Sequence, residues 1–171
     1  IDSIGGKEAA EKRLDEMFRR LDASYGDEWF ASGNEPSFQI PWIYNWAGAP
    51  YKAQQVIRRI LNEQYSSRVN GLPGNDDLGS MGAWYVFASI GLFPEIPGVG
   101  GFSVNSPVFR KIVLHLPEGD VIIKGGDEKK EYIHSLSLDG KKMEGTWIDW
   151  SDLYRGATLE YKLSGKPDKT W

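Results

Sequence analysis

Residues 71–87 read GLPGNDDLGSMGAWYVF, an acid-bearing loop that runs directly into an aromatic-rich helix. A second loop of the same kind, GNEPS at residues 33–37, lies earlier in the chain. Glycine lets a backbone bend sharply and leaves room for a ligand beside it. Carboxylates placed in such bends, among tryptophans and tyrosines, suit carbohydrate chemistry or calcium binding better than they suit a core. These two acid loops are therefore the basis of the functional interpretation.

Around the acid loops, residues 1–95 are predicted to be helical. Apolar side chains recur at intervals of three and four from Lys7 to Leu21 and from Tyr51 to Gln64, which predicts two amphipathic helices. A third helix is predicted from Ser80 to Ile90, where Gly91 ends it. This helix is apolar almost all round, so we expect it to be buried in a larger packed assembly.

Between the first two helices, Ser37 is expected to cap a helix that continues through Ala47. Pro41 falls in its first turn, where proline is tolerated. Gly48 ends this helix, and Pro50 opens the next at the position where proline fits best.

Beyond a hinge rich in proline and glycine at residues 94–101, the chain changes to the alternating pattern of β-strands. The predicted strands are Phe109–Leu116, Asp120–Lys124, Tyr132–Leu138 and Thr158–Leu163. The sequence therefore predicts an α+β fold with an antiparallel β-region. The expected domains are residues 1–95, helical, and residues 96–171, the C-terminal β-region.

Composition excludes several classes of function. The net charge is −4 over 171 residues, which does not suit a nucleic-acid partner or an anionic membrane. There is no cysteine, and the two histidines, His115 and His134, both lie in strand-like stretches, so a Cys- or His-based metal centre is not expected. No apolar run approaches a membrane span. Residues 1–20 form a charged amphipathic helix rather than a signal peptide, as expected of a fragment or a mature subunit.

The acids in the two loops have structural as well as functional interpretations. Glu35 either stabilises a helix N-terminus electrostatically or holds a sugar hydroxyl or a calcium ion, a hard cation that prefers oxygen ligands. Asp76 and Asp77 are adjacent, so one can face a pocket while the other ties the loop to backbone amides or caps the Ser80 helix. Capping alone does not require two glycines, a proline, an amide and two acids within so short a loop.

Hydrolysis of a glycosidic bond with inversion requires two carboxyl groups. An ionised carboxylate activates water, and a protonated carboxyl lies on the other face of the sugar, roughly 6.5–9.5 Å away. Spacing in the sequence does not show whether Glu35 is that acid or a ligand of the sugar or the metal.

The acid loops, with YNWAG at residues 44–48, GLFP at residues 91–94 and SP at residues 106–107, closely resemble glycoside hydrolase family 92. Members of this family are calcium-dependent exo-α-mannosidases of inverting mechanism. They combine an N-terminal β-sandwich with an (α/α)6-barrel catalytic domain. This chain is similar to the C-terminal portion alone, namely the last barrel helices and the β-region that follows.

The resemblance implies roles for the acid-loop residues. Asp77 would be the general base that activates water, with Asp76 as a candidate assistant. Asn34 and Glu35 would bind the substrate, and Glu35 and Asp77 would contact calcium directly or through water. The family's general acid lies in an earlier Glu-Gly-Asn type motif that this chain lacks, so we expect the isolated chain to be inactive.

The resemblance also implies the partners, which are a mannose-containing glycan and the rest of the parent polypeptide. An extracytoplasmic location is expected, in the periplasm, at the surface or secreted, of bacterial type. Two departures bear on specificity. Asn75 stands where some members have an acid that assists the base, and Asn34 stands where members that cleave α-1,2 linkages carry histidine. The linkage cleaved, α-1,2 or a related one, is therefore left open.

Two other classes of function remain as alternatives. In a non-catalytic carbohydrate-binding module, aromatic side chains would stack on sugars without reaction. The candidates are Trp42, Trp46, Trp84 and Tyr85, whose spacing is that of buried helical positions rather than of a sheet face. A purely structural α+β domain would tolerate substitution of Glu35 and Asp77.

Overall fold

The computed structural model describes residues 1–24 and 26–171. Two compact units divide the chain, Ile1–Val86 and Phe87–Trp171. The division falls within the last long helix, earlier in the chain than the boundary expected between residues 95 and 96. The final turn of that helix belongs to the second unit because Ile90 packs in the core of the β-region.

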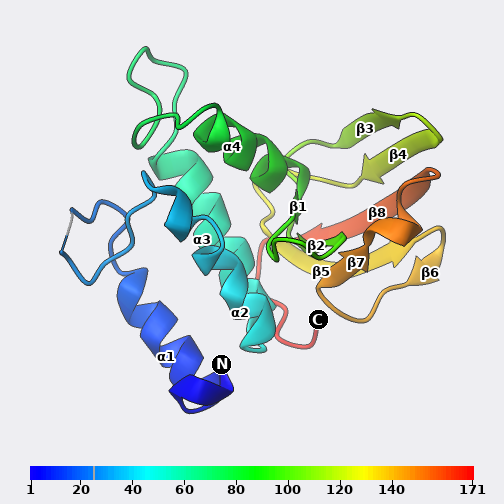
Figure 1. Ribbon diagram of the computed structural model, residues 1–171. Helices are drawn as coiled ribbons and strands as arrows, with labels where there is room; N and C mark the ends of the chain where they lie inside the picture. The colour runs from blue at the N-terminus through cyan, green and yellow to red at the C-terminus, as the bar shows by residue number, and fades with distance from the viewer. Residues whose placement is uncertain (25) are drawn as a thin grey trace. The chain divides into compact units, whose positions relative to one another are not determined.

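Helical segments make up the first unit and lead into the second (Figure 1). They are η1 (Asp2–Ile4), α1 (Lys7–Met17), η2 (Glu35–Ser37), η3 (Ile40–Trp42), α2 (Ile43–Trp46), α3 (Pro50–Glu63) and α4 (Ser80–Ile90). No helix in the described residues is long and apolar enough to cross a lipid bilayer.

The amphipathic helices α1 and α3 confirm the periodicity seen in the sequence. Pro50 opens α3, and the predicted apolar stripe along this helix is buried. Helix α1 ends at Met17, before the predicted end at Leu21, but Phe18 and Leu21 are still buried. The apolar pattern therefore continues one turn beyond the helix itself.

The single helix predicted from Ser37 through Ala47 is wrong. This segment forms the short turns η2 and η3 and then one turn of α-helix, α2. Pro36 lies in η2 and Pro41 in η3, and neither has an amide hydrogen to donate to a continuous α-helix. Ser37 is the last residue of η2 and caps no helix there.

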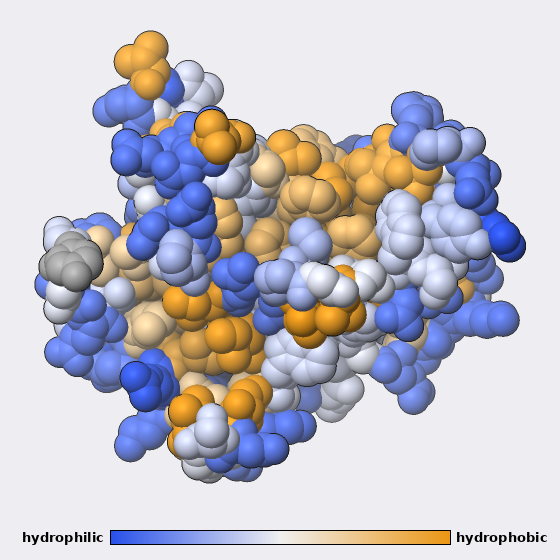
Figure 2. Space-filling view, in the orientation of Figure 1, coloured by the Kyte–Doolittle hydropathy of each residue, from blue (hydrophilic) through white to orange (hydrophobic). Residues whose placement is uncertain are grey.

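Helix α4 has the predicted bounds, but it is not buried all round. Met81, Trp84 and Ala88 are buried, whereas Tyr85 and Val86 are 41% and 56% exposed. Large apolar side chains are also exposed in the loop that precedes α4, at Val69, Leu72 and Leu78. Figure 2 shows hydrophobic side chains that project from this loop at the upper left.

The second unit contains two sheets. Strands β1 (Leu92–Phe93), β2 (Gly101–Val104) and β7 (Trp147–Asp149) form a three-stranded antiparallel sheet. The order in the five-stranded sheet is β3-β4-β8-β5-β6, with bounds Lys111–Leu116, Gly119–Lys124, Ala157–Ser164, Tyr132–Leu138 and Lys141–Lys142. The four predicted strands are β3, β4, β5 and β8, and the α+β class is confirmed.

One pair in the five-stranded sheet is parallel, although the sequence predicts an antiparallel region. Strands β4 and β8 pair in parallel, with Ile123 opposite Leu159. Parallel neighbours need a crossover connection of roughly a dozen or more residues. The chain between Lys124 and Ala157 provides this length and forms β5, β6 and β7 on the way.

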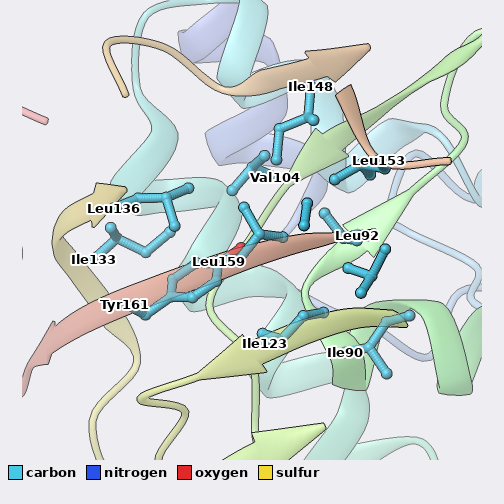
Figure 3. Close-up of a cluster of buried hydrophobic side chains, with 12 residues drawn as sticks. Ile90, Leu92, Val104, Ile123, Ile133, Leu136, Ile148, Leu153, Leu159 and Tyr161 are labelled. Carbon is cyan, nitrogen blue, oxygen red and sulfur yellow. The ribbon is translucent and has the colours of Figure 1, made fainter. Parts of the chain in front are cut away.

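A single apolar cluster holds the second unit together. Figure 3 shows its side chains meeting between strands of both sheets. The buried members are Ile90, Leu92, Val104, Val121, Ile123, Ile133, Leu136, Ile148, Leu153, Ala157, Leu159 and Tyr161. Burying each large aliphatic side chain stabilises the folded state by about 1.5–3 kcal/mol, so this cluster accounts for much of the unit's stability.

Candidate functional site

The two acid loops lie against each other through their glycines. A methyl group built on Gly33 would lie 2.5 Å from the carbonyl oxygen of Pro73, and one built on Gly74 would overlap the carbonyl oxygen of Gly33. Only glycine allows two backbones to approach this closely. The contact therefore brings together the loops that carry Glu35 and Asp77, which are distant in the sequence.

The second loop ends in three successive residues with left-handed backbone. The φ angles are 49° at Asp77, 61° at Leu78 and 90° at Gly79. Aspartate adopts this conformation more readily than most side chains, and leucine adopts it rarely. The Ser80 amide donates to the carbonyl oxygen of Asp77 at 3.3 Å, so this left-handed turn joins directly to the start of α4.

Asp76 is the acid that ties the loop to α4. Its carbonyl oxygen accepts hydrogen bonds from the Ser80 hydroxyl at 3.1 Å and the Met81 amide at 3.2 Å. Its carboxylate Oδ1 accepts a longer bond from the Gly82 amide at 3.4 Å. Asp76 therefore satisfies amides at the N-terminus of α4, where a negative charge is also favoured.

The Asp77 carboxylate does not hold the loop to α4 in this way. Its side chain is half-buried, and in the described chain its carboxylate forms no hydrogen bond or ion pair. The side chains of Asn34 and Glu35 are exposed and likewise lack such partners in residues 1–24 and 26–171. Polar groups of these three side chains are thus available to a ligand, whereas that of Asp76 is engaged with the helix.

Trp84 connects α4 to Phe38, the residue that follows the first acid loop. Its indole Nε1 donates to the carbonyl oxygen of Phe38 at 3.0 Å, and its ring stacks on Tyr65 at 6.0 Å between centroids. The Tyr65 hydroxyl donates to the carbonyl oxygen of Met81 at 3.3 Å. Burial, and to a lesser degree the charge of Asp76, raises the pKa of Tyr65 to about 12, so the phenol stays a donor at neutral pH.

The aromatics considered for a binding module divide into two groups. Trp42 and Trp84 are buried, while Trp46 and Tyr85 are 43% and 41% exposed. The bridge from Trp84 to Phe38 is a contact that sequence reasoning missed, and no local pattern signals it. Gly33 and Gly74 both belong to the acid-loop motifs of the sequence. That they contact each other is visible only in the folded chain.

No group of three or more His, Cys, Asp or Glu side chains in the described residues is arranged to hold a metal ion. The two loops carry side-chain oxygens that the described chain leaves without partners, namely the carboxylates of Glu35 and Asp77 and the amide of Asn34. Such donors suit a hard cation, but they are fewer than the six to eight oxygens that calcium takes.

Known proteins with similar sequences and structures are glycosidases. A protein of Arthroderma benhamiae, described as an uncharacterized secreted glycosidase, is 34% identical over 158 residues, which cover 89% of this chain and 20% of that protein. A family GH92 alpha-mannosidase from Bacteroides thetaiotaomicron has a TM-score of 0.86 at 33% identity, over 96% of this chain and 22% of its own.

Two further solved structures extend this comparison. The Bacteroides thetaiotaomicron alpha-mannosidase in complex with mannoimidazole has a TM-score of 0.87 at 31% identity, over 96% of this chain and 23% of that chain. A family GH92 inverting mannosidase from the same organism has a TM-score of 0.85 at 28% identity, over 97% and 25%. The chain thus spans a quarter or less of the length of these relatives.

The family profile described as the glycosyl hydrolase family 92 catalytic domain matches residues 1–165. The resemblance carried by the motifs between residues 33 and 110 therefore extends over the helices and nearly all of the β-region. On this match, supported by the similarity to the mannosidases, the chain belongs to glycosyl hydrolase family 92.

Proposed function

We propose that the full-length protein removes terminal α-linked mannose from glycans by calcium-dependent hydrolysis with inversion. Family membership and the similarity to solved alpha-mannosidases support the mannosidase activity. One of those relatives is named an inverting mannosidase, which supports the stereochemical course. The linkage, α-1,2 or a related one, belongs to the same proposal, as does the role of each acid-loop residue.

Asp77 is the proposed general base. A base must lie within hydrogen-bond reach of the water that it activates, and a carboxylate already bound to backbone amides is a poorer acceptor for that water. Of the two adjacent aspartates, Asp76 is bound to α4 and Asp77 has no partner in the described chain. The assistance expected of Asp76 is then positional, because its bonds fix the start of α4 and so the turn that carries Asp77.

Asn34 and Glu35 are the proposed substrate ligands. Both are exposed on the loop that contacts the Asp77 loop through Gly33 and Gly74. An amide and a carboxylate together offer donors and acceptors that match the vicinal hydroxyls of a sugar. The contact between the two loops supports a role in which Asn34 and Glu35 would hold the sugar beyond the bond to be cleaved.

The residues present fit calcium in chemistry, since every donor on the two loops is oxygen. Glu35 and Asp77 would hold the ion, directly or through water, and the remaining ligands would come from elsewhere in the full-length protein. When bound, the ion would supply a positive charge that keeps nearby carboxylates ionised and orients sugar hydroxyls. The residues of this chain hold the sugar and take the proton from water.

Inversion also needs a general acid on the other face of the sugar, roughly 6.5–9.5 Å from the base. We assign this group to another part of the parent polypeptide, because the chain lacks the motif that carries it in the family. Since the fungal relative is described as secreted, we propose an extracytoplasmic location as well.

The observation that carries the proposal is the contact between the acid loops with an unpartnered Asp77 at the turn. The test is Asp77→Asn in the full-length protein, with kcat measured on α-mannobiose. Loss of the base should lower kcat by about 10²–10⁴-fold, while circular dichroism and the thermal midpoint stay close to those of the wild type.

Asp139 provides a matched control, because it has the same φ of 49° and lies in the hairpin turn between β5 and β6. Asp139→Asn should leave kcat within about twofold of the wild-type value, in line with ordinary surface substitutions. Near-normal turnover by Asp77→Asn would assign the base to another residue. Equal losses in both variants would show that the effect comes from backbone strain rather than from the carboxylate.

A further inference from the structure

A hollow lies beside the first acid loop, within the same compact unit. It has a volume of about 610 Å³ and shares Gly33, Asn34 and Pro73 with the two acid loops. The rest of its wall comes mainly from residues 21–24 and 26–32, together with Gln64 at the end of α3. The hollow therefore includes Asn34, one of the residues proposed to bind substrate.

Packing and backbone pairing hold part of the pocket wall, around Phe30 and the Asp22–Ala31 pair. Phe30 is 3% exposed, its ring lies 4.8 Å from that of Phe18, and its amide donates to the carbonyl oxygen of Met17 at 3.0 Å. An isolated β-bridge pairs Asp22 with Ala31 and so closes the base of the segment. Trp29 adjoins the buried Phe30 and lines the pocket, half-buried.

Three side chains give the pocket its chemistry. The Ser32 hydroxyl, on a residue 5% exposed, donates to Gln64 Oε1 at 3.1 Å. This bond fixes the Gln64 amide and leaves its nitrogen without a partner in the described chain. Asp27 uses Oδ2 to accept the Ser24 amide at 2.8 Å, which leaves Oδ1 with no partner there either. With the ring of Trp29, the pocket combines an aromatic surface, a donor and an acceptor.

We propose that this pocket binds the third sugar of the glycan, counted from the non-reducing end. The inference rests on the proposed function, in which the terminal mannose reacts and Asn34 and Glu35 hold the second sugar. An aromatic side chain with a few fixed polar groups is the composition of a small-molecule pocket that orients a neutral, hydroxyl-rich ligand. The pocket carboxylates disfavour an anionic group, because Arg20 is hydrogen-bonded to Asp22 and interacts with Asp27 only through longer-range charge attraction.

The proposal predicts a preference for longer substrates that depends on Trp29. In the full-length protein, Trp29→Ala should lower the ratio of kcat/KM for α-mannotriose to kcat/KM for α-mannobiose by about tenfold, which corresponds to about 1.4 kcal/mol. Asp27→Ala, on an exposed turn, should lower the same ratio. Trp29→Tyr keeps an aromatic ring and should retain most of the wild-type ratio.

Trp150→Ala is the matched control, since Trp150 is a 43% exposed tryptophan in the β-region. It should leave the ratio unchanged. A wild-type ratio in both Trp29→Ala and Asp27→Ala would overturn the subsite, and so would a loss of equal size in Trp150→Ala. If the wild type hydrolyses neither oligosaccharide nor p-nitrophenyl α-mannoside, the proposed function itself fails, which is a distinct result from an unchanged ratio.

Discussion

Two aspartates with the same backbone conformation have different surroundings. At Asp139 and Gly140 the φ angles are 49° and 77°, as a tight hairpin turn between β5 and β6 requires, and the Asp139 carboxylate accepts the Thr158 amide at 2.7 Å. At Asp77 no strand pairing needs the left-handed turn, and the next residue, Leu78, is fully exposed. Non-glycine residues in this region cost of order 1–3 kcal/mol each. The Asp139 carboxylate accepts a backbone amide, whereas the Asp77 carboxylate has no hydrogen-bond partner in the described chain, and this difference is why the functional role is proposed for Asp77.

A third aspartate, Asp168, links the end of the chain to β5. It accepts hydrogen bonds from the Thr170 hydroxyl at 2.7 Å and amide at 2.9 Å, and it contacts His134 Nδ1 at 2.8 Å. The bonds from Thr170, followed by the contact with His134, lower the pKa of Asp168 to about 2. A pKa lower in the folded than in the unfolded state stabilises the fold above the unfolded value of about 3.9. That stabilisation is lost as the pH falls toward 2.

We therefore expect Asp168→Asn to lower the thermal midpoint at pH 6, and the difference from the wild type to shrink as the pH is lowered from 5 to 2.5. Thermal unfolding followed by tryptophan fluorescence over this range measures the difference. Asp152→Asn is the control, because Asp152 is exposed and has no side-chain hydrogen bond in the described chain. A difference that stays constant, or that widens in acid, would contradict the assigned role of the carboxylate.

At the scale of elements, the acid loops depend on the contact between Gly33 and Gly74. Neither glycine has a positive φ, so an alanine is excluded there only by the facing backbone. Gly74→Ala should push the loops apart without unfolding the helices around them. Because a displacement of about 1 Å at a catalytic group can cost about 10²-fold, we expect kcat/KM on α-mannobiose to fall by roughly that factor.

Gly165 is the matched control for this substitution. A methyl group there meets no atom within 4 Å, and its φ is also not positive. Gly165→Ala should retain the wild-type kcat/KM and thermal midpoint. If Gly74→Ala is as active as Gly165→Ala, the close approach of the loops does not matter for turnover.

The elements also show what the sequence could and could not predict. Helices α3 and α4 were predictable because their helix-forming runs end at polar or glycine residues. The break at Pro41 was not, because proline is tolerated in a first turn and the competing 3₁₀ turns leave no periodic pattern. Strands as short as β1 and β6 are too brief for alternation to be recognised.

The candidate site could likewise be predicted only in part. The residue types in the acid loops indicated which segments would form a candidate site, since glycines, carboxylates and amides stand together in the sequence. The distinction between Asp76 and Asp77 depended on backbone angles that no sequence pattern specifies. The contact between Gly33 and Gly74 is long-range, so it arises from the packing of the whole helical unit.

At the scale of the whole molecule, the alignments include 89–97% of this chain but only 20–25% of each relative described above. A chain that supplies carboxylates from two loops, and no cluster of three in the described residues, needs ligands from elsewhere to hold a calcium ion. The proposal therefore assigns the remaining calcium ligands and the general acid to other parts of the full-length protein.

Calcium dependence is the prediction that tests this arrangement. Removal of calcium from the full-length protein with EGTA should abolish turnover of α-mannobiose, and added calcium should restore it. Magnesium should not, because it demands a smaller octahedral site and gives up its water reluctantly. Glu35→Gln should raise the calcium concentration needed for half-maximal rate, since it removes one anionic ligand, whereas Asp139→Asn should not change it. Full turnover by protein shown to be metal-free would remove calcium from the mechanism and leave Glu35 as a sugar ligand only.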